Sequence, residues 1–485
     1  MGRNLFNSIA QRLVVDYCRL SIVGNKDGFL TKDDVCSLLS KAAGAVVVVG
    51  SNLMLRIHYE QVYKHSTEGH YIYVCENTKT LLADMRRDAY IVDFAITDMF
   101  PLFADKALLR NQPVVVLSRI YEEMGIRRIS IPECHELVGR IHNEIEIRRK
   151  ESAEHYLSGL QDVDVDWIHP NNTISHISKI IVKAIRNGVY DSIDSEISKQ
   201  NSAFQSWVDS DYFAFLHSNY LLHPKSVNNI LPYLAEKHGR TDKIALLIVD
   251  GFTYWQGVVL TEYLSNNGMT LKLDSTLAWI PTITMLSRQA IFRGTDPKLE
   301  YKQSPDNERK LWFDYWTKKG YGQYEVQYIC DKDEFAINES TMRLAVVTVE
   351  MDEKMHASTD YQDLLSLTEN WCPRITEKIK AMKSAGFAVY ITTDHGSVLS
   401  HGWRPLTRVE KVFLYKDGSR GARHLIYKDI DEQQRFFNDN NQLPMLRHDN
   451  WLAIKNDRCF ANEYKDMITH GGSHFLEVVI PFIII

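Results

Sequence analysis

The chain has 485 residues, of which 45% are hydrophobic and 24% are charged, an ordinary composition for a globular protein. Its length is enough for roughly two to four domains, each with a buried core. The net charge of −6 excludes a chain that is basic throughout and binds nucleic acid by overall charge, although it allows a local basic groove.

The cysteines and the two chain ends indicate a cytoplasmic protein. The cysteines are odd in number and form no CxxC pair, which argues against a disulfide framework or a cysteine zinc site. The first residues lack the uninterrupted apolar core of a signal peptide. The final EVVIPFIII is too short to span a bilayer. We therefore expect a cytoplasmic location, no membrane partner and a buried last strand.

The first section of the chain, residues 1–130, alternates apolar runs with helical patterns. Apolar runs rich in β-branched residues are typical of strands that are covered on both faces of a sheet. They occupy residues 45–50, 71–75, 89–95 and 112–118. These runs predict an N-terminal α/β domain that contains four strands.

Residues 131–237 carry apolar side chains at helical spacing instead. The stretch from 131 to 160 is long and amphipathic, with Pro132 near its start, where a helix tolerates proline. The following segments, up to residue 234, continue this pattern. We predict a helical connector between two α/β domains.

A second α/β domain is predicted over residues 238–485. Its first strand is the apolar run KIALLIVDG at residues 243–251. Further strands are predicted at 271–276, 326–330, 343–349, 387–393, 411–415, 424–428 and 476–481, and helices at 255–266 and 360–385. Apolar strands that alternate with helices favour an α/β fold with a doubly wound, mainly parallel sheet.

Carboxylate and imidazole side chains follow several of these strands directly or stand in a turn before the last one. They are Asp250, Asp352, His356, Asp394, His395 and His470. In open α/β sheets, reactive groups collect at the carboxyl ends of the strands. We therefore expect these side chains to meet at one edge of the sheet.

Each of these motifs also has an ordinary interpretation. Asp250 followed by a glycine fits a simple turn, and Asp352 with His356 fits an exposed helical pair at positions i and i+4. The Asp-His-Gly sequence fits a capped turn, and a histidine before two glycines fits a loop residue. The order of the motifs and their shared placement at strand ends favour one hydrolase site over four unrelated features.

Two threonines precede a predicted helix at residues 285–292. Thr282 and Thr284 lie in the sequence PTITMLSR. A hydroxyl at this position is usually a helix N-cap. The N-terminus of a helix also favours anions, and a bound metal ion activates a nearby hydroxyl for attack on phosphorus. Both interpretations fit the residues.

Taken in order, the motifs resemble those of the alkaline phosphatase superfamily, and most closely its PglZ-type domain. The similarity covers residues 243–481 and rests on IVDG, PTITMLSR, the Asp-x-x-x-His of Asp352 and His356, TDHG, and HGG followed by LEVVIP. The combination is specific, whereas no single motif is. The resemblance implies an alkaline-phosphatase-like fold for this half of the chain.

The resemblance further implies two divalent metal ions, zinc or alternatively manganese, which suit oxygen and nitrogen ligands. The ligands implied for one ion are Asp250, Thr284, Asp394 and His395, and those for the other are Asp352, His356 and His470. Thr284 is the implied nucleophile and forms a phosphothreonine, with Thr282 as the alternative. His474 stands where the resemblance leads us to expect a small hydroxyl residue, and we expect it to be a packing or surface histidine.

Basic side chains are the candidate substrate ligands. Arg288 follows the threonines by one helical turn, and residues 403–428 include Arg420 and Arg423 among other basic residues. Such a segment is either a solvated surface or a track for phosphate groups beside the metal ions.

We interpret the chain as a metal-dependent phosphodiesterase. PglZ-type proteins are associated with bacterial phage-defence (BREX) systems and some act on oligonucleotides, so the resemblance implies small or cyclic oligonucleotide substrates and protein partners in a defence complex. One alternative is a phosphomonoesterase or sulfatase of the same superfamily. The other is a structural hub of a defence complex with little catalysis.

Overall fold

The computed structural model describes residues 4–216, 223–415 and 422–485. The chain forms two compact units, Met1–Arg148 and Arg149–Ile485. The expected division into domains at residues 1–130, 131–237 and 238–485 stays a prediction. Among the residues that the structure describes, no helix is both long enough and apolar enough to cross a membrane.

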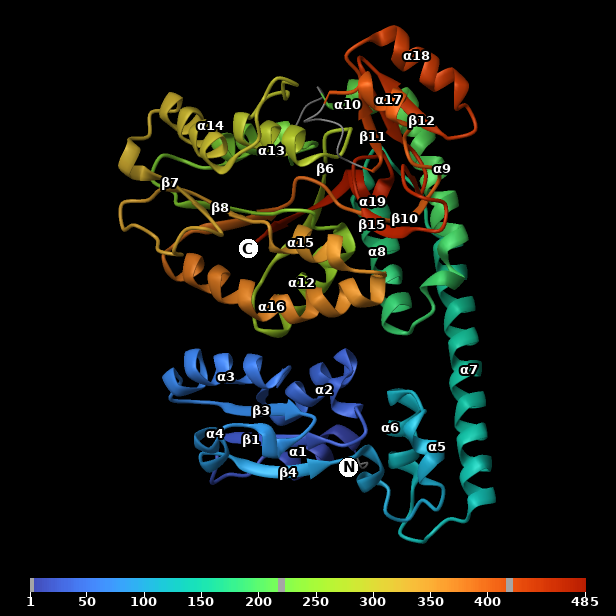
Figure 1. The fold of residues 1–485 in the computed structure, drawn as a ribbon. Helices are drawn as coiled ribbons and strands as arrows, with labels where there is room; N and C mark the ends of the chain where they lie inside the picture. The colour runs from blue at the N-terminus through green and yellow to red at the C-terminus, as the bar shows by residue number, and fades with distance from the viewer. Residues whose placement is uncertain (1–3, 217–222, 416–421) are drawn as a thin grey trace. The chain divides into compact units, whose positions relative to one another are not determined.

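The first unit contains a four-stranded parallel sheet (Figure 1). Its strands are β1 (Leu20–Asn25), β2 (Ala45–Val49), β3 (His70–Cys75) and β4 (Tyr90–Phe94), in the spatial order β2-β3-β1-β4. Side chains of α1 (Leu5–Leu13), α2 (Asp33–Ala43) and α6 (Val114–Glu123) pack with one face of the sheet, and those of α3 (Asn52–Gln61) and α4 (Ala83–Arg87) with the other. The expected α/β domain and three of its strands are confirmed.

The fourth expected strand, at residues 112–118, is wrong. This segment forms α6, which follows the short helix α5 (Lys106–Arg110). Pro113 stands at the N-cap, and the buried residues Val116, Leu117 and Ile120 have the spacing of a helix face. Packing of that face against the core outweighs the strand preference of three consecutive valines. The true fourth strand, β1, was not predicted.

The predicted helical region is confirmed as a series of helices. They are α7 (Ile131–Gln161), α8 (Pro170–Arg186), α9 (Asp194–Ser210), α10 (Tyr212–Leu216) and α11 (Ile230–Lys237). Helix α8 buries Ile174, Ile177, Ile181 and Ile185, which recur at helical spacing, and packs on the helix α12 (Tyr254–Asn266).

The second unit is built on a six-stranded sheet in the order β6-β16-β9-β5-β8-β7 (Figure 1). The strands are β5 (Ile244–Val249), β6 (Lys272–Leu277), β7 (Val326–Cys330), β8 (Arg343–Thr348), β9 (Ala388–Thr392) and β16 (Val479–Ile484). Strand β16 runs antiparallel to both neighbours, and the pairs β9-β5, β5-β8 and β8-β7 are parallel. The expected doubly wound, mainly parallel sheet is confirmed.

Helices cover both faces of this sheet. Alternate residues of β5 point to opposite cores, because successive side chains of a strand face opposite ways. One core includes α8, α12 (Tyr254–Asn266) and α16 (Tyr361–Ser384), and the other includes α11, α13 (Thr284–Arg293) and α14 (Pro305–Lys318). The central strands are therefore fully buried, which explains their uninterrupted apolar sequences.

Two small sheets and several short helices complete the unit. One sheet has the order β14-β10-β15 and the other β11-β13-β12. Their strands are β10 (Val398–Gly402), β11 (His424–Ile426), β12 (Met445–His448), β13 (Trp451–Ile454), β14 (Arg458–Cys459) and β15 (Asp466–Thr469). The helices are α15 (Glu350–Ala357), α17 (Arg408–Val412), α18 (Ile430–Asp439) and α19 (Phe475–Val478).

The strand expected at 411–415 is wrong, because α17 occupies its first residues. Thr407 and Glu410 form a reciprocal capping box that fixes the start of this helix. The expected strand at 476–481 is divided between α19 and β16.

Ile480 offers a test of the antiparallel strand β16. Its side chain is fully buried in the core on one face of the sheet. Ile480→Ala removes packed methyl groups and is expected to lower the free energy of unfolding by about 2–5 kcal/mol. Urea denaturation measures this change. The matched variant Ile430→Ala removes an isoleucine that is 61% exposed and is expected to change stability by less than about 0.5 kcal/mol. Equal losses for the two variants would contradict the assigned core.

Candidate functional site

Three aspartates lie together at the carboxyl edge of the large sheet. Strands β9, β5 and β8 are neighbours in that order, and Asp394, Asp250 and Asp352 follow their ends. The backbone N–H of Asp250 donates to the carbonyl of Thr348 at the end of β8, which holds the two strand ends side by side. The parallel arrangement of strands therefore brings together residues that are far apart in the sequence.

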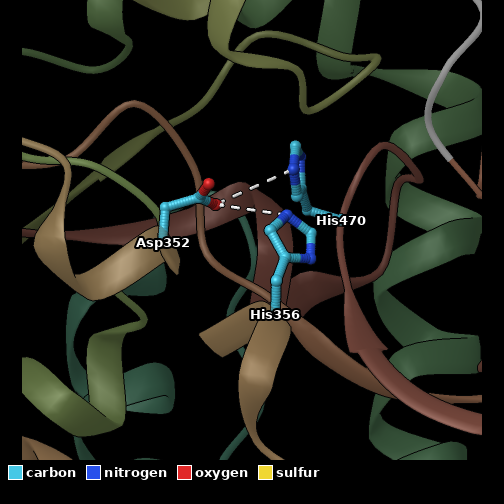
Figure 2. Close-up of side chains that lie close together, drawn as sticks. All are labelled: Asp352, His356 and His470. Carbon is cyan, nitrogen blue, oxygen red and sulfur yellow. Dashed lines mark ion pairs between the residues drawn. The ribbon is translucent and has the colours of Figure 1, made fainter. Parts of the chain in front are cut away.

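One group of candidate metal ligands consists of Asp352, His356 and His470 (Figure 2). Asp352 and His356 are one helical turn apart on α15, with His356 Nε2 3.6 Å from Asp352 Oδ1. His470 comes from the turn after β15 and places its Nε2 3.9 Å from the same oxygen. Figure 2 shows both rings facing the carboxylate of Asp352. The structure thus brings together the three ligands expected for one ion.

A second group consists of Asp250, Asp352 and His395. His395 Nε2 lies 3.6 Å from Asp250 Oδ1 and 3.7 Å from Asp394 Oδ2. Asp352 therefore belongs to both groups, while Asp394 joins the second through His395. The structure brings Asp250, Asp394 and His395 together as expected and adds Asp352 as a carboxylate shared by both groups.

Each of the three aspartates has one carboxylate oxygen that is buried and has no hydrogen-bond partner. These buried oxygens are Asp250 Oδ1, Asp352 Oδ1 and Asp394 Oδ2. Burial, followed by the neighbouring charge of Asp394, raises the pKa of Asp250 well above its usual range, and burial raises the pKa of Asp394. Like charges held this close in a buried place are costly unless cations balance them. The donor set therefore fits divalent metal ions.

Two imidazoles are held so that they present a lone pair to the carboxylates. His395 Nδ1 donates to the carbonyl of Gly396 at 3.0 Å, and His470 Nδ1 donates to the carbonyl of Thr282 at 2.8 Å. The two rings are stacked, with centroids 3.8 Å apart. Burial, together with the neighbouring His395, lowers the pKa of His470 well below its usual range. In a neutral imidazole whose Nδ1 carries the proton, Nε2 keeps its lone pair. Nε2 is therefore the atom that can bind a metal ion.

The two threonines have different surroundings. Thr284 is the first residue of α13, after the N-cap Ile283, and its Oγ1 lies 3.1 Å from His395 Nε2. Thr282 is fully buried, where its hydroxyl donates to the carbonyl of Gly472 and accepts from the N–H of Gly471, both at 3.0 Å. Thr284 therefore faces the carboxylate and imidazole cluster, whereas the hydroxyl of Thr282 holds the loop that carries His470.

That loop requires glycine. Gly471 has a φ of +112°, and a Cβ atom there would lie 2.6 Å from His424 Nδ1. A Cβ atom at Gly472 would lie 2.4 Å from the carbonyl oxygen of Ile454. Neither position accepts a side chain without a shift of its neighbours. This explains why two glycines follow His470 in the sequence.

Two of the arginines predicted to bind substrate are buried in ion pairs. Arg288 is buried and forms ion pairs with Asp250 (2.6 Å) and Glu308 (2.7 Å). Arg423 is fully buried, pairs with Glu477 (2.9 Å) and also donates to backbone carbonyls. Three of the five N–H groups of Arg288 donate to Asp250 and Glu308, and the substrate-binding roles of both arginines stay predictions. Arg420 lies outside the described residues.

Two buried glutamates of the site were missed in the sequence. Glu308 pairs with Arg288, and Glu477 pairs with Arg423 while accepting the N–H groups of Gly472 and His474. His474 is a buried residue whose Nδ1 accepts the N–H of Leu476 at the start of α19. The expected packing role of His474 agrees with this position. The only sequence signal for Glu477 is its place three residues after His474, as in a capping box.

Parts of the chain are similar to known proteins. Among solved structures, phosphonoacetate hydrolase from Sinorhizobium meliloti 1021 is 12% identical, with a TM-score of 0.35 over 50% of this chain and 89% of that chain. Murine ectonucleotide pyrophosphatase/phosphodiesterase 5 is 12% identical, with a TM-score of 0.34 over 50% and 88%. No curated protein matches the chain significantly. The model of the BREX system PglZ alkaline phosphatase-like domain matches residues 230–485, slightly more than half of the chain. The chain therefore belongs to the PglZ family of alkaline-phosphatase-like proteins.

Proposed function

We propose that this protein is a metal-dependent phosphodiesterase that uses Thr284 as its nucleophile. The observation that carries the proposal is the convergence of three unpartnered carboxylate oxygens, two oriented imidazoles and the Thr284 hydroxyl at one sheet edge. Three buried carboxylate oxygens without partners at one place are explained by a bound cation. A hydroxyl beside such a centre is suited to attack on phosphorus.

Two divalent ions, zinc or manganese, are proposed to occupy the site. Asp250, Thr284, Asp394 and His395 are the proposed ligands of one ion, and Asp352, His356 and His470 those of the other. When bound, such a pair lowers the pKa of a nearby hydroxyl and offsets negative charge in the transition state. The carbonyls of Gly396 and Thr282 keep the two imidazoles in the tautomer that suits this role.

Thr284 is proposed to carry the phosphoryl group between two displacement steps. Its Oγ1 loses a proton and forms a bond to phosphorus, while the bond to one ester oxygen breaks and that alcohol leaves with a proton from solvent. Water then attacks the phosphothreonine, which releases the phosphate monoester and restores the Thr284 hydroxyl. The N-terminus of α13 favours the negative charge of the phosphoryl group at this position.

The charges around the site support a diester substrate. Asp250, Asp352, Asp394 and Glu308 carry four negative charges. The guanidinium of Arg288, which pairs with Asp250 and Glu308, offsets one of them and leaves three. Two divalent ions convert these to a single positive charge, which matches the single charge of a phosphate diester better than the two charges of a monoester. Among the described residues, Arg288 is the sole arginine or lysine that forms an ion pair with a candidate metal ligand. Its side chain is buried.

The family description supports the proposed setting. Its description places the domain in the BREX system, so we propose a cytoplasmic role in phage defence with protein partners. Small or cyclic oligonucleotides are the proposed substrates, because they are the phosphate diesters that a defence system would meet.

Asp352 gives a prediction about metal content. Asp352 is a proposed ligand of one ion and also lies within reach of Asp250 and His395, so Asp352→Asn is expected to remove one zinc ion per chain and to weaken the binding of the other. His356→Ala is expected to remove only one ion. Metal analysis after dialysis against micromolar zinc measures both. An unchanged affinity for the remaining ion in Asp352→Asn would contradict the shared position of this carboxylate.

The two threonines are separated by their dependence on zinc. Thr284→Ala is expected to lower diester hydrolysis at least about 1000-fold at every zinc concentration, because the nucleophile is lost. Thr282→Val loses the hydrogen bonds to the His470 loop and is expected to need more zinc, yet to recover most of its turnover at saturating zinc. The reverse pattern would identify Thr282 as the nucleophile.

Substrate charge is tested with two nitrophenyl esters. The catalytic efficiency for bis-nitrophenyl phosphate is expected to exceed that for nitrophenyl phosphate by at least about tenfold, because the site balances one negative charge. A preference for the monoester would identify a phosphomonoesterase. Zinc-bound protein that hydrolyses neither ester would favour the structural hub.

A further inference from the structure

We propose that Arg288 and Glu308 form a buried clamp that positions Asp250 for one metal ion. The inference rests on the proposed metal-dependent function and assigns positioning roles to two residues that no comparison assigns. Arg288 lies on α13, one turn after Thr284, and Glu308 lies on α14. Both side chains are buried beneath the carboxylate cluster.

The clamp is continuous from Asp250 to the edge of the sheet. Arg288 Nη1 donates to Asp250 Oδ2 at 2.6 Å, while Nε and Nη2 donate to the two oxygens of Glu308 at 2.7 and 3.0 Å. Tyr328 on β7 donates its hydroxyl to Glu308 Oε2 at 2.6 Å, and Gln303 also donates to Glu308. Every nitrogen of the guanidinium is therefore engaged, and Glu308 is fixed from its far side.

The clamp decides which oxygen of Asp250 is left for a ligand. Oδ2 is held by Arg288, whereas Oδ1 is buried, has no hydrogen-bond partner and lies 3.6 Å from His395 Nε2. The carboxylate is thereby oriented to present one oxygen to the ion that His395 and Asp394 would hold. Partners of this kind, which contact a ligand but not the metal, commonly tune metal affinity.

Glu308 also balances the positive charge that the clamp brings to the site. Without its carboxylate, the guanidinium of Arg288 would have Asp250 as its remaining ion-pair partner beside a divalent cation. Repulsion of the cation and a tighter hold of Arg288 on Asp250 act in the same direction. Both effects weaken metal binding at the group of Asp250, Asp394 and His395, and the group of His356 and His470 does not depend on the clamp.

The test is a two-site zinc titration of the full chain against a chromophoric chelator. Glu308→Gln keeps the shape of the side chain and is expected to weaken one of the two zinc affinities about 10- to 100-fold and leave the other unchanged. His356→Ala is expected to weaken the other site, and the double variant both. Glu410→Gln is the matched control, because Glu410 makes a bidentate pair with Arg404 that includes no candidate ligand.

Tyr328→Phe provides a milder variant in case Glu308→Gln fails to fold. It removes one hydrogen bond to Glu308 and is expected to weaken the same zinc site by a smaller factor. At saturating zinc, both variants are expected to keep the KM of the wild type for bis-nitrophenyl phosphate, since the clamp does not touch substrate. A raised KM at saturating zinc would instead assign Arg288 to phosphate binding and overturn the clamp.

Unchanged zinc affinities in folded variants, or an equal loss at both sites, would also overturn the clamp. These results leave the phosphodiesterase proposal intact. Wild-type chain that binds no zinc would overturn the phosphodiesterase proposal and the clamp together, so the two failures are distinguishable.

Discussion

The mutual repulsion of three neighbouring carboxylates, two of them buried, is the constraint on which the candidate site depends. Asp250, Asp352 and Asp394 follow three neighbouring strands, and each leaves one oxygen without a hydrogen-bond partner. Desolvation and like charge make this cluster costly by itself. The fold tolerates it because β5, β8 and β9 are anchored in two apolar cores, and because Arg288 balances part of the charge.

The remaining parts of the site hold the ligands in a fixed orientation. The Thr282 hydroxyl and the backbone carbonyl of the same residue bind the loop that carries His470. Glu477 accepts two backbone N–H groups of that loop and pairs with Arg423, which is anchored to the β13–β14 turn. The buried Arg423–Glu477 pair thus connects the residue before β11 to the loop that carries His470. A buried ion pair adds little net stability over a well-packed apolar pair. The role of this pair is therefore to fix the local geometry of the loop.

The sequence was informative where local pattern and fold agree. Uninterrupted apolar runs identified the central strands, and the position of Asp250 and Asp394 directly after them located the site, because parallel strands end at one edge. Runs such as 112–118 were misread, since a proline at the N-cap and the spacing of three buried residues outweighed the strand preference of valine. The Thr407 to Glu410 capping box likewise converted an expected strand into α17.

The surroundings of the arginines were not predictable from local sequence. Arg288 pairs with a glutamate 20 residues away, and Arg423 with one 54 residues away. Which basic residues face the substrate and which neutralise buried carboxylates is decided by tertiary packing, which charge counting along the chain does not detect. The choice between Thr282 and Thr284 likewise needed the positions of the His470 loop and His395.

The most direct test of the metal-centred site is a crystal structure of the zinc-loaded protein with anomalous diffraction at the zinc edge. We expect two zinc peaks about 4 Å apart. One should contact Asp250, Asp394 and His395, and the other Asp352, His356 and His470. An absence of zinc at these residues, or zinc bound only elsewhere on the chain, would contradict the assignment of this cluster as the catalytic centre.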